Sequence, residues 1–196
     1  HMVLRNMLGT HVEQKGSYVS PETLRFDFSH FQKLTPEEIR QVEREVNKLI
    51  RENITLEESR NVPISEAKKM GAMALFGEKY GDFVRVIRYG QSVELCGGTH
   101  AKATGSIGFF KIVSESSIAA GIRRIEAVTA FSAELFVENL QDMQASVKEL
   151  FNNTPDVISA IKKSMDESAS LRKRIEDFMQ ERAITLRNSM LERAED

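Results

Sequence analysis

The side chains best suited to chemistry in this sequence are Cys96, the only cysteine of the 196 residues, and His100, one of its four histidines. A thiolate and an imidazole at this spacing can bind one zinc ion, because zinc takes Cys sulfur and His nitrogen in a tetrahedral shell. Two ligands fill only half of that shell. The spacing therefore leaves a second interpretation open, in which Cys96 is a buried structural residue and His100 faces solvent.

Two glycines, Gly97 and Gly98, separate these candidate ligands. Glycine allows a tight turn and lets a ligand approach the main chain closely. The preceding pattern predicts a strand at Phe83–Tyr89, a turn, and a second strand at Ser92–Leu95 that pairs back on it. Cys96 would then open a glycine loop at the end of a strand, where a rigid scaffold commonly presents functional groups.

Helix and strand signals are mixed over the first 130 residues. Thr35, Pro36 and Glu38 form a capping box with proline at the first helical position, and this helix is expected to end near Asn53. The order of elements predicts an α+β fold with mainly antiparallel sheet and packed helices. Further short helices are expected at 3–8 and 65–70, and further strands at Tyr18–Val19, Leu24–Phe28, Ile54–Val62, Ile107–Ser117 and Ile122–Val128.

The pattern changes after residue 130. Apolar residues recur at helical spacing in two segments, with Thr154 as the expected N-cap of the second helix and Pro155 as its first residue. The first helix is expected to run for about 22 residues and the second for about 38. We therefore expect a long C-terminal antiparallel helical hairpin or coiled coil. Its uncovered end is solvated or pairs with another chain, as in a homo-oligomer formed through these helices.

Composition and charge narrow the class of protein. The 27 Lys and Arg are nearly balanced by 29 Asp and Glu, so charge alone does not indicate nucleic-acid binding, and any RNA contact needs a local patch. No apolar run approaches the roughly 18 residues of a membrane helix, and no membrane partner is expected. A single cysteine cannot form an internal disulfide, which favours a cytoplasmic setting. His1 and Met2 are interpreted as the remnant of a tag, with the natural chain beginning further upstream.

Six separated segments follow one another in an order that one family shares. They are Leu8–Val12, Gln14–Ser17, Leu24–Phe28, Glu94–His100, Thr104–Gly108 and Gly121–Ala127. Together they resemble the editing domain of alanyl-tRNA synthetases. Threonyl-tRNA synthetases share the metal pattern, but Cys96–His100 and Arg123–Glu126 favour the alanyl family. Two domains are expected, a truncated editing domain over 1–130 and, over 131–196, a helical hairpin that resembles the start of the family's C-terminal region.

The resemblance implies a hydrolytic activity. The editing domain cleaves the ester of tRNA(Ala) that carries serine or glycine instead of alanine. A small alanine pocket rejects glycine and serine weakly, and a second, hydrolytic site is the physical remedy. The parent enzyme is an alanine–tRNA ligase, whose ATP and magnesium belong to an aminoacylation site outside this chain.

The resemblance also implies a zinc site. In the family, zinc is held by a His-x-x-x-His pair on a helix and by a Cys and a His of the second motif, onto which Cys96 and His100 map. The first pair is expected just upstream of Leu8 and outside this chain. We therefore expect the intact parent to bind zinc, and this fragment to bind it weakly or not at all and to be inactive alone. His11 and His30 are the alternative ligands.

Other residues of the motifs are candidates for binding and catalysis. Gln14 is a candidate catalytic residue through a polar contact at the pocket, against the alternative of a plain loop role. Gly97 and Gly98 are expected to offer backbone donors to the aminoacyl end, and Thr99, the second catalytic candidate, to offer its hydroxyl there. Four cationic side chains are candidates for contacts with tRNA phosphates, against the alternative that each is a solvated surface charge. These are Lys15, Lys102, Arg123 and Arg124.

Two further readings of the sequence remain open. One is a freestanding trans-editing protein with the same chemistry, against which the start inside a helix argues. The other is a helical dimerisation module in which the α+β part is only structural, motivated by the partly uncovered long helix.

Overall fold

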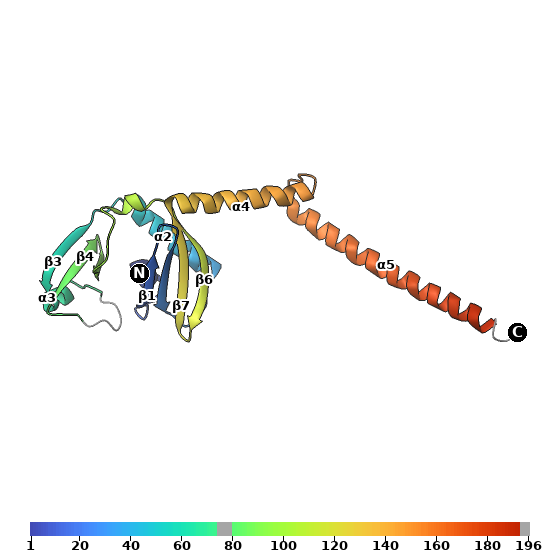
Figure 1. Ribbon diagram of the computed structural model, residues 1–196, viewed down its shortest axis with the longest axis horizontal. Helices are drawn as coiled ribbons and strands as arrows, with labels where there is room; N and C mark the ends of the chain where they lie inside the picture. Colours follow the sequence, from blue (N-terminus) through green and yellow to red (C-terminus); the bar gives the residue numbers. More distant parts are fainter. Residues whose placement is uncertain (74–79, 193–196) are drawn as a thin grey trace. The chain divides into compact units, whose positions relative to one another are not determined.

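The structure, a computed structural model, describes residues 1–73 and 80–192, with side chains described as far as Met190. It divides into two compact units, residues 1–137 and 138–196, and each is described by itself. The elements in chain order are α1 (Met2–Leu8), β1 (Gln14–Val19), β2 (Leu24–Ser29), α2 (Pro36–Arg51), β3 (Glu57–Pro63), α3 (Ile64–Lys69), β4 (Phe83–Tyr89), β5 (Ser92–Leu95), the 3-10 turn η1 (Thr104–Ile107), β6 (Phe110–Ala119), β7 (Ile122–Thr129), α4 (Ala130–Leu150) and α5 (Val157–Glu192) (Figure 1).

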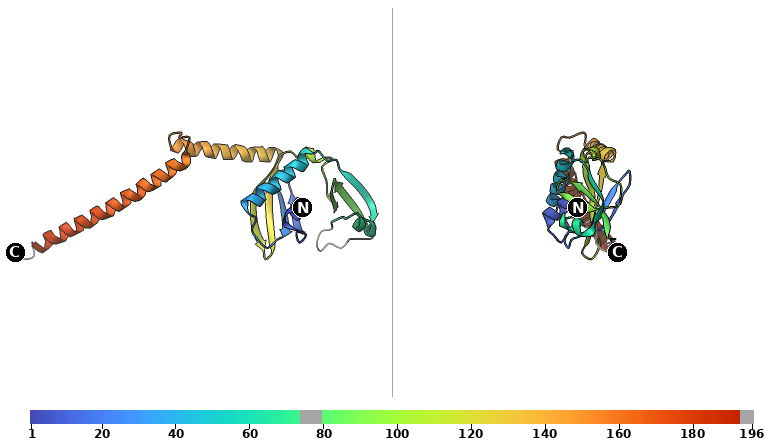
Figure 2. Two further views of the ribbon diagram at one scale, coloured as in Figure 1. Left: turned by 180° about the vertical axis from the view of Figure 1, so that it is seen from behind. Right: turned by 90° about the vertical axis from the view of Figure 1, so that its left-hand side faces the viewer.

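The first unit contains a four-stranded antiparallel sheet in the order β1-β2-β7-β6. Helix α2 lies across one face of this sheet (Figure 2). Phe28 of β2 and Val12, before β1, are fully buried, and Ile125 and Ala127 of β7 complete the centre of the core. The strand predicted at Leu24–Phe28 is confirmed, with Phe28 in this core and Leu24 and Phe26 packed against it.

The start of α2 follows the capping pattern in the sequence. The Thr35 hydroxyl accepts from the Glu38 N–H at 3.2 Å, and Glu38 Oε2 accepts from the Thr35 N–H at 2.7 Å. Two backbone donors at the helix start are thereby satisfied. The helix buries Val42 and Ile50 against the sheet.

Helix α2 also closes one edge of the sheet. Asn47 Nδ2 donates to the Phe110 carbonyl at 2.8 Å, and Asn47 Oδ1 accepts from the Phe110 N–H at 2.9 Å. Glu43 Oε1 accepts from the Ile112 N–H at 2.8 Å, and Lys111 Nζ donates to Glu43 Oε2 at 2.9 Å. Both helix residues are buried, so these bonds satisfy polar groups that would otherwise be costly to enclose.

A second, three-stranded antiparallel sheet in the order β3-β4-β5 lies in the same unit (Figure 1). Its small core joins Ala67 of α3 to Val84 and Val86 of β4 and to Val93 and Leu95 of β5. The bounds predicted for β4 and β5 are confirmed to the residue. The sheet thus delivers Cys96 directly after β5, as the sequence predicts.

Helices α4 and α5 confirm the two predicted C-terminal helices. The predicted start of the second was wrong, because α5 begins at Val157 and Asp156 Oδ1 accepts from the Ser159 N–H at 3.0 Å in place of a cap by Thr154. Apolar side chains along α5 remain exposed, Met165 at 66% and Ile175 at 62%. The packing expected for an antiparallel hairpin is therefore not found among its described side chains. Within the described residues, no helix has the length and apolar character that crossing a membrane requires.

Candidate functional site

Arg85, in β4, holds the first half of the loop that follows β5. Its Nη1 donates to the carbonyl oxygen of Cys96 at 3.0 Å and to that of Gly98. Its own carbonyl accepts from the Cys96 N–H at 3.3 Å. On the other side, Arg85 Nε donates to Glu58 Oε1 at 3.0 Å. Arg85 and then Arg60 hold the pKa of Glu58 at about 2, so this carboxylate remains charged at neutral pH.

The chain that leaves the loop is fixed by a second set of contacts. The Tyr89 hydroxyl donates to the Ala101 carbonyl, and the Leu56 N–H donates to the Lys102 carbonyl at 2.8 Å. Thr104 Oγ1 donates to the Leu49 carbonyl at the end of α2, at 2.7 Å, and accepts from the Ile54 N–H at 2.8 Å. Both ends of the loop are therefore attached to regular structure, one end to β4 and the other to the end of α2.

Between these attachments, Gly97, Gly98 and Thr99 are exposed. Neither glycine adopts the left-handed conformation, so a tight turn is not what requires them. A Cβ added at Gly97 would meet nothing within 4 Å, and one at Gly98 would meet only the Cys96 Sγ, at 3.7 Å. The three residues border a cavity of about 620 Å³, together with Arg60, Asn61, Phe83, Val84, Arg85 and His100. The open space beside the backbone fits the predicted close approach of a ligand.

His100 borders this cavity with its ring partly enclosed. Its Nε2 is buried and has no hydrogen-bond partner in the structure. The Tyr89 ring lies 6.3 Å away, centroid to centroid. Burial, with a smaller contribution from the Arg85 charge, holds the pKa of His100 below its usual value. The imidazole is therefore neutral at pH 7, which is the form that can bind a metal ion.

Two side chains of this loop are of types that bind zinc, the half-buried thiol of Cys96 and the imidazole of His100. Among residues 1–73 and 80–192, no group of three or more His, Cys, Asp or Glu side chains is arranged to hold a metal ion. His11 and His30, the predicted alternatives, contact each other instead, with His11 Nε2 2.9 Å from His30 Nδ1. The unpartnered nitrogen of His100 and the thiol of Cys96 are both donor types that zinc takes in its shell.

His1, interpreted from the sequence as the remnant of a tag, contacts β5 of the same sheet. The His1 side chain is 7% exposed, and its Nδ1 lies 3.3 Å from Glu94 Oε1, two residues before Cys96. His1 directly precedes α1, the helix just upstream of the loop that begins at Gly9. The family resemblance implies a histidine pair in this neighbourhood, so the position of His1 before Leu8 is the signal that could have found it.

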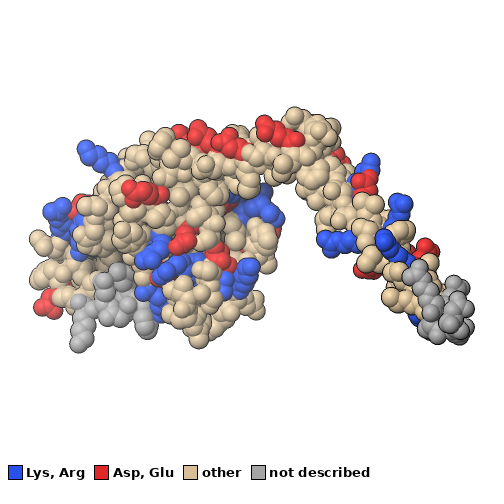
Figure 3. Space-filling model, turned by 45° about the vertical axis from the view of Figure 1, so that its right-hand side comes forward, with Lys and Arg blue, Asp and Glu red and all other residues tan. Residues whose placement is uncertain are grey.

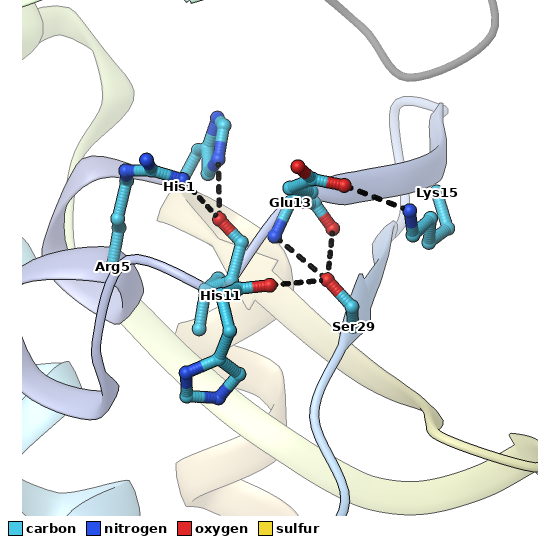
Figure 4. A network of polar contacts seen from close by, with 7 residues as sticks. His1, Arg5, His11, Glu13, Lys15 and Ser29 are labelled. Carbon is cyan, nitrogen blue, oxygen red and sulfur yellow. Dashed lines mark hydrogen bonds and ion pairs between the residues drawn. The ribbon is translucent and has the colours of Figure 1, made fainter.

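Gln14 and Lys15 start the edge strand β1 of the four-stranded sheet, and Figure 4 shows Lys15 beside Glu13. Gln14 Nε2 donates to Ser17 Oγ at 3.0 Å, and Lys15 Nζ forms an ion pair with Glu13 at 2.9 Å. The preceding turn is held by Ser29, whose hydroxyl donates to the His11 carbonyl at 2.6 Å and accepts from the Glu13 N–H at 2.9 Å. The structure gives these two candidates a fixed backbone, while their roles at the ester and the phosphates stay predictions.

The side chains predicted to contact tRNA phosphates differ in the partners that they already have within the protein. Arg123 forms an ion pair with Glu115, whose side chain is 1% exposed, and Arg124 donates two bonds to Asp27 at 2.7 and 2.8 Å. The Lys102 side chain is exposed. On the face seen in Figure 3, Lys and Arg are interspersed with Asp and Glu. Both arginines thus already act within the sheet, and their contact with tRNA stays a prediction.

Comparison with known proteins assigns the loop to a family segment. Residues 84–126 match the family described as the second additional domain of threonyl and alanyl tRNA synthetases. Over 192 residues, 98% of the chain, the sequence is 62% identical to the alanine–tRNA ligase of Porphyromonas gingivalis. It is 59% identical to that of Parabacteroides distasonis over the whole chain, and 58% identical to that of Bacteroides fragilis over 98% of it. The chain spans 22% of the length of each relative. The resemblance to alanyl-tRNA synthetases is thereby confirmed.

Proposed function

We propose, from this similarity to a segment of alanine–tRNA ligases, that the chain is the editing part of an alanyl-tRNA synthetase, and that within the longer enzyme this part hydrolyses the ester of tRNA(Ala) mischarged with serine or glycine. The observation that carries the proposal is the identity of 62% over nearly the whole chain, within which the matched family segment contains the Cys96–His100 loop. Ligation of alanine, with ATP and magnesium, is assigned to the remainder of such an enzyme.

Zinc is proposed at the thiol of Cys96 and the imidazole of His100. Both are donor types that zinc prefers, and the buried Nε2 of His100 lacks any other partner. His1 is a third candidate because it contacts the strand that leads to Cys96. When bound, zinc supplies a Lewis acid that can orient the ester or lower the pKa of a water molecule.

The exposed part of the loop is proposed to bind the aminoacyl end. The N–H groups of Gly97 and Gly98 donate to the substrate, and their lack of a side chain leaves the approach open. The Thr99 hydroxyl is assigned to orient the ester, and the Gln14 amide is assigned a second polar contact. Of the phosphate candidates, Lys102 lies closest in the chain to the loop, two residues after His100.

The test is hydrolysis of Ser-tRNA(Ala). It is measured for these 196 residues and for a longer polypeptide that also carries the upstream His-x-x-x-His segment. Cys96→Ala is expected to lower the rate more than about 100-fold in the longer polypeptide, because it removes a proposed metal ligand. Undiminished hydrolysis by this variant would remove the site assignment. Elemental analysis of the wild type and of His1→Ala shows whether the chain alone retains zinc and whether His1 holds it.

Gly81 provides a matched control for a substitution at Gly97. A Cβ at Gly97 and a Cβ at Gly81 both meet open space, and neither residue has a positive φ, so alanine leaves the fold unchanged at both. Gly97→Ala is expected to slow hydrolysis about tenfold because its methyl group enters the substrate's approach. Gly81→Ala is expected to leave the rate unchanged. Equal rates for the two variants would place the substrate elsewhere.

Association through the C-terminal helices is a second proposed property. Large apolar side chains of α5 stay exposed in the described chain, among them Ile158, Leu171 and Phe178. Contact with the same stripe of a second copy would remove this surface from water. Sedimentation at rising concentration is expected to detect a dimer, and a strict monomer would contradict it.

A further inference from the structure

We infer that Arg85 is a positioning residue that sets the geometry of the Cys96–His100 loop for hydrolysis. The hydrolytic part of this inference rests on the proposed function. Arg85 lies 11 residues before Cys96 and was not singled out by the sequence, because an arginine in a strand normally marks a solvated face.

The first argument is the direction of the Arg85 bonds. One nitrogen, Nη1, donates to two carbonyl oxygens of the loop, those of Cys96 and Gly98. These carbonyls belong to the Cys96–Gly97 and Gly98–Thr99 peptide units, so a single planar group fixes the backbone on both sides of the two exposed glycines. Charge-assisted bonds are about twice as strong as bonds between neutral groups. The loop has no regular secondary structure here and depends on such bonds for a defined backbone.

The second argument is that the Arg85 side chain is itself held. Its side chain is 22% exposed, and its Nε donates to Glu58 of β3 at 3.0 Å. Glu58 also binds Arg60, so the carboxylate remains engaged if one arginine is lost. A side chain fixed by a partner on the neighbouring strand can transmit the rigidity of the sheet to the loop.

The third argument is the contrast with Arg88, three residues further along β4. The contact of Arg88 with Glu57 of β3 is long, 3.9 Å from Nε to Oε2, and no bond from Arg88 to the loop is found among the described residues. Both arginines lie on β4, and each contacts a carboxylate of β3, Glu58 for Arg85 and Glu57 for Arg88. Only Arg85 also binds the carbonyls of the loop, and Arg88 is therefore its matched control.

The experiment replaces each arginine with methionine, which keeps an unbranched stem and removes every donor. Backbone hydrogen exchange of residues 96–100 is measured in the 196-residue chain, with residues 112–116 of β6 as an internal reference. Arg85→Met is expected to speed exchange in the loop at least about fivefold and to leave the reference unchanged. Arg88→Met is expected to match the wild type in both segments. Equal loop exchange in the two variants would overturn the inference.

Kinetics separate positioning from general stability. In the longer polypeptide, Arg85→Met is expected to lower kcat for Ser-tRNA(Ala) about 10- to 100-fold, with KM and the thermal midpoint almost unchanged. Arg85→Lys, which keeps one charged donor, is expected to recover part of kcat. A loss that follows the thermal midpoint instead would assign Arg85 a structural role only. If the wild type itself hydrolyses no Ser-tRNA(Ala), the proposed function fails, and hydrogen exchange still decides whether Arg85 sets the loop.

A second variant protects the test against misfolding of Arg85→Met. Glu58→Gln removes the charge that orients Arg85 and leaves the bonds from Arg85 to the loop in place. It is expected to speed loop exchange less than Arg85→Met does, by about twofold. If Glu58→Gln does not change exchange in the loop, Glu58 does not help to orient Arg85. A greater change with Glu58→Gln than with Arg85→Met would contradict the inference that Glu58 acts on the loop through Arg85.

Discussion

The arginines of the two sheets in the first unit differ in the groups that they bind. In the four-stranded sheet, Arg124 and Arg123 bind carboxylates on neighbouring strands, Asp27 and Glu115, and these pairs are largely enclosed. In the three-stranded sheet, Arg85 also binds a carboxylate but extends beyond it to carbonyl oxygens of an irregular loop. Arg123 and Arg124 thus pair with carboxylates inside their sheet, whereas Arg85 has a second set of partners in the loop of the proposed site.

The same contrast holds for burial. The core of the four-stranded sheet joins α1, α2 and strands distant in sequence around the fully buried Phe28, whereas the core of the other sheet has fewer buried residues, namely Ala67, Val84, Val86, Val93 and Leu95. Stability therefore lies mainly in the four-stranded sheet, and the proposed chemistry lies at the end of the smaller one. A site on the less extensively packed part of a fold depends more on specific bonds than on buried area.

The largest effect expected from this division concerns Phe28 and Val86. Phe28→Ala should cost about 3–5 kcal/mol in free energy of unfolding, because it leaves a large cavity in the main core. Val86→Ala should cost about 2 kcal/mol, since fewer methyl groups are removed. Urea unfolding measures both costs. Val86 pairs with Leu95, so its variant should speed hydrogen exchange at residues 96–100 more than Phe28→Ala does where both remain folded. The reverse order would break the comparison.

A smaller effect is expected at the edge of the four-stranded sheet. Asn47→Leu leaves the buried N–H and carbonyl of Phe110 without their partner and should cost about 2–3 kcal/mol. The better helix propensity of leucine offsets only about 0.5 kcal/mol of this. The free energy of unfolding from urea titration tests the value. Gln41→Leu, at an exposed position of the same helix, is the control and should change stability by less than about 0.5 kcal/mol.

The smallest effect is expected for the pair of Asp27 and Arg124, and it depends on pH. The bond from Arg124 holds the pKa of Asp27 below its ordinary value of 3.8. A lowered native pKa means that the charged carboxylate stabilises the fold above pH 3.8 and that this contribution is lost as the pH falls toward the native pKa. Asp27→Asn should therefore cost roughly 1–2 kcal/mol at pH 7.

The difference between Asp27→Asn and the wild type should shrink below pH 3.8, as measured by urea unfolding across the acid range. Glu22→Gln, at the exposed turn between β1 and β2, is the control and should track the wild type at every pH. A difference for Asp27→Asn that is independent of pH would mean that the pair contributes packing and not charge.

The sequence predicted local structure where one short segment contains the whole cause. Thr35 and Glu38 cap α2 with each other, and β4 and β5 occupy the predicted residues. The resemblance to alanyl-tRNA synthetases was also predictable, from motifs such as Glu94–His100. Contacts between distant segments were not, because their cause lies in two places at once. Three features are of this kind: the division into two sheets, the bonds of Arg85 to the loop, and the ion pair of Arg123 with Glu115.

The closure of β6 by Glu43 and Asn47 has a consequence for synthesis of the chain. Because α2 precedes β6 in the sequence, the side chains that cover this edge leave the ribosome well before the strand does. The new strand therefore meets an intramolecular partner as soon as it emerges. Unpaired strand edges can pair with other chains and aggregate. Here Asn47 and Glu43 of the same polypeptide bind the backbone N–H groups of Phe110 and Ile112 and so protect this edge.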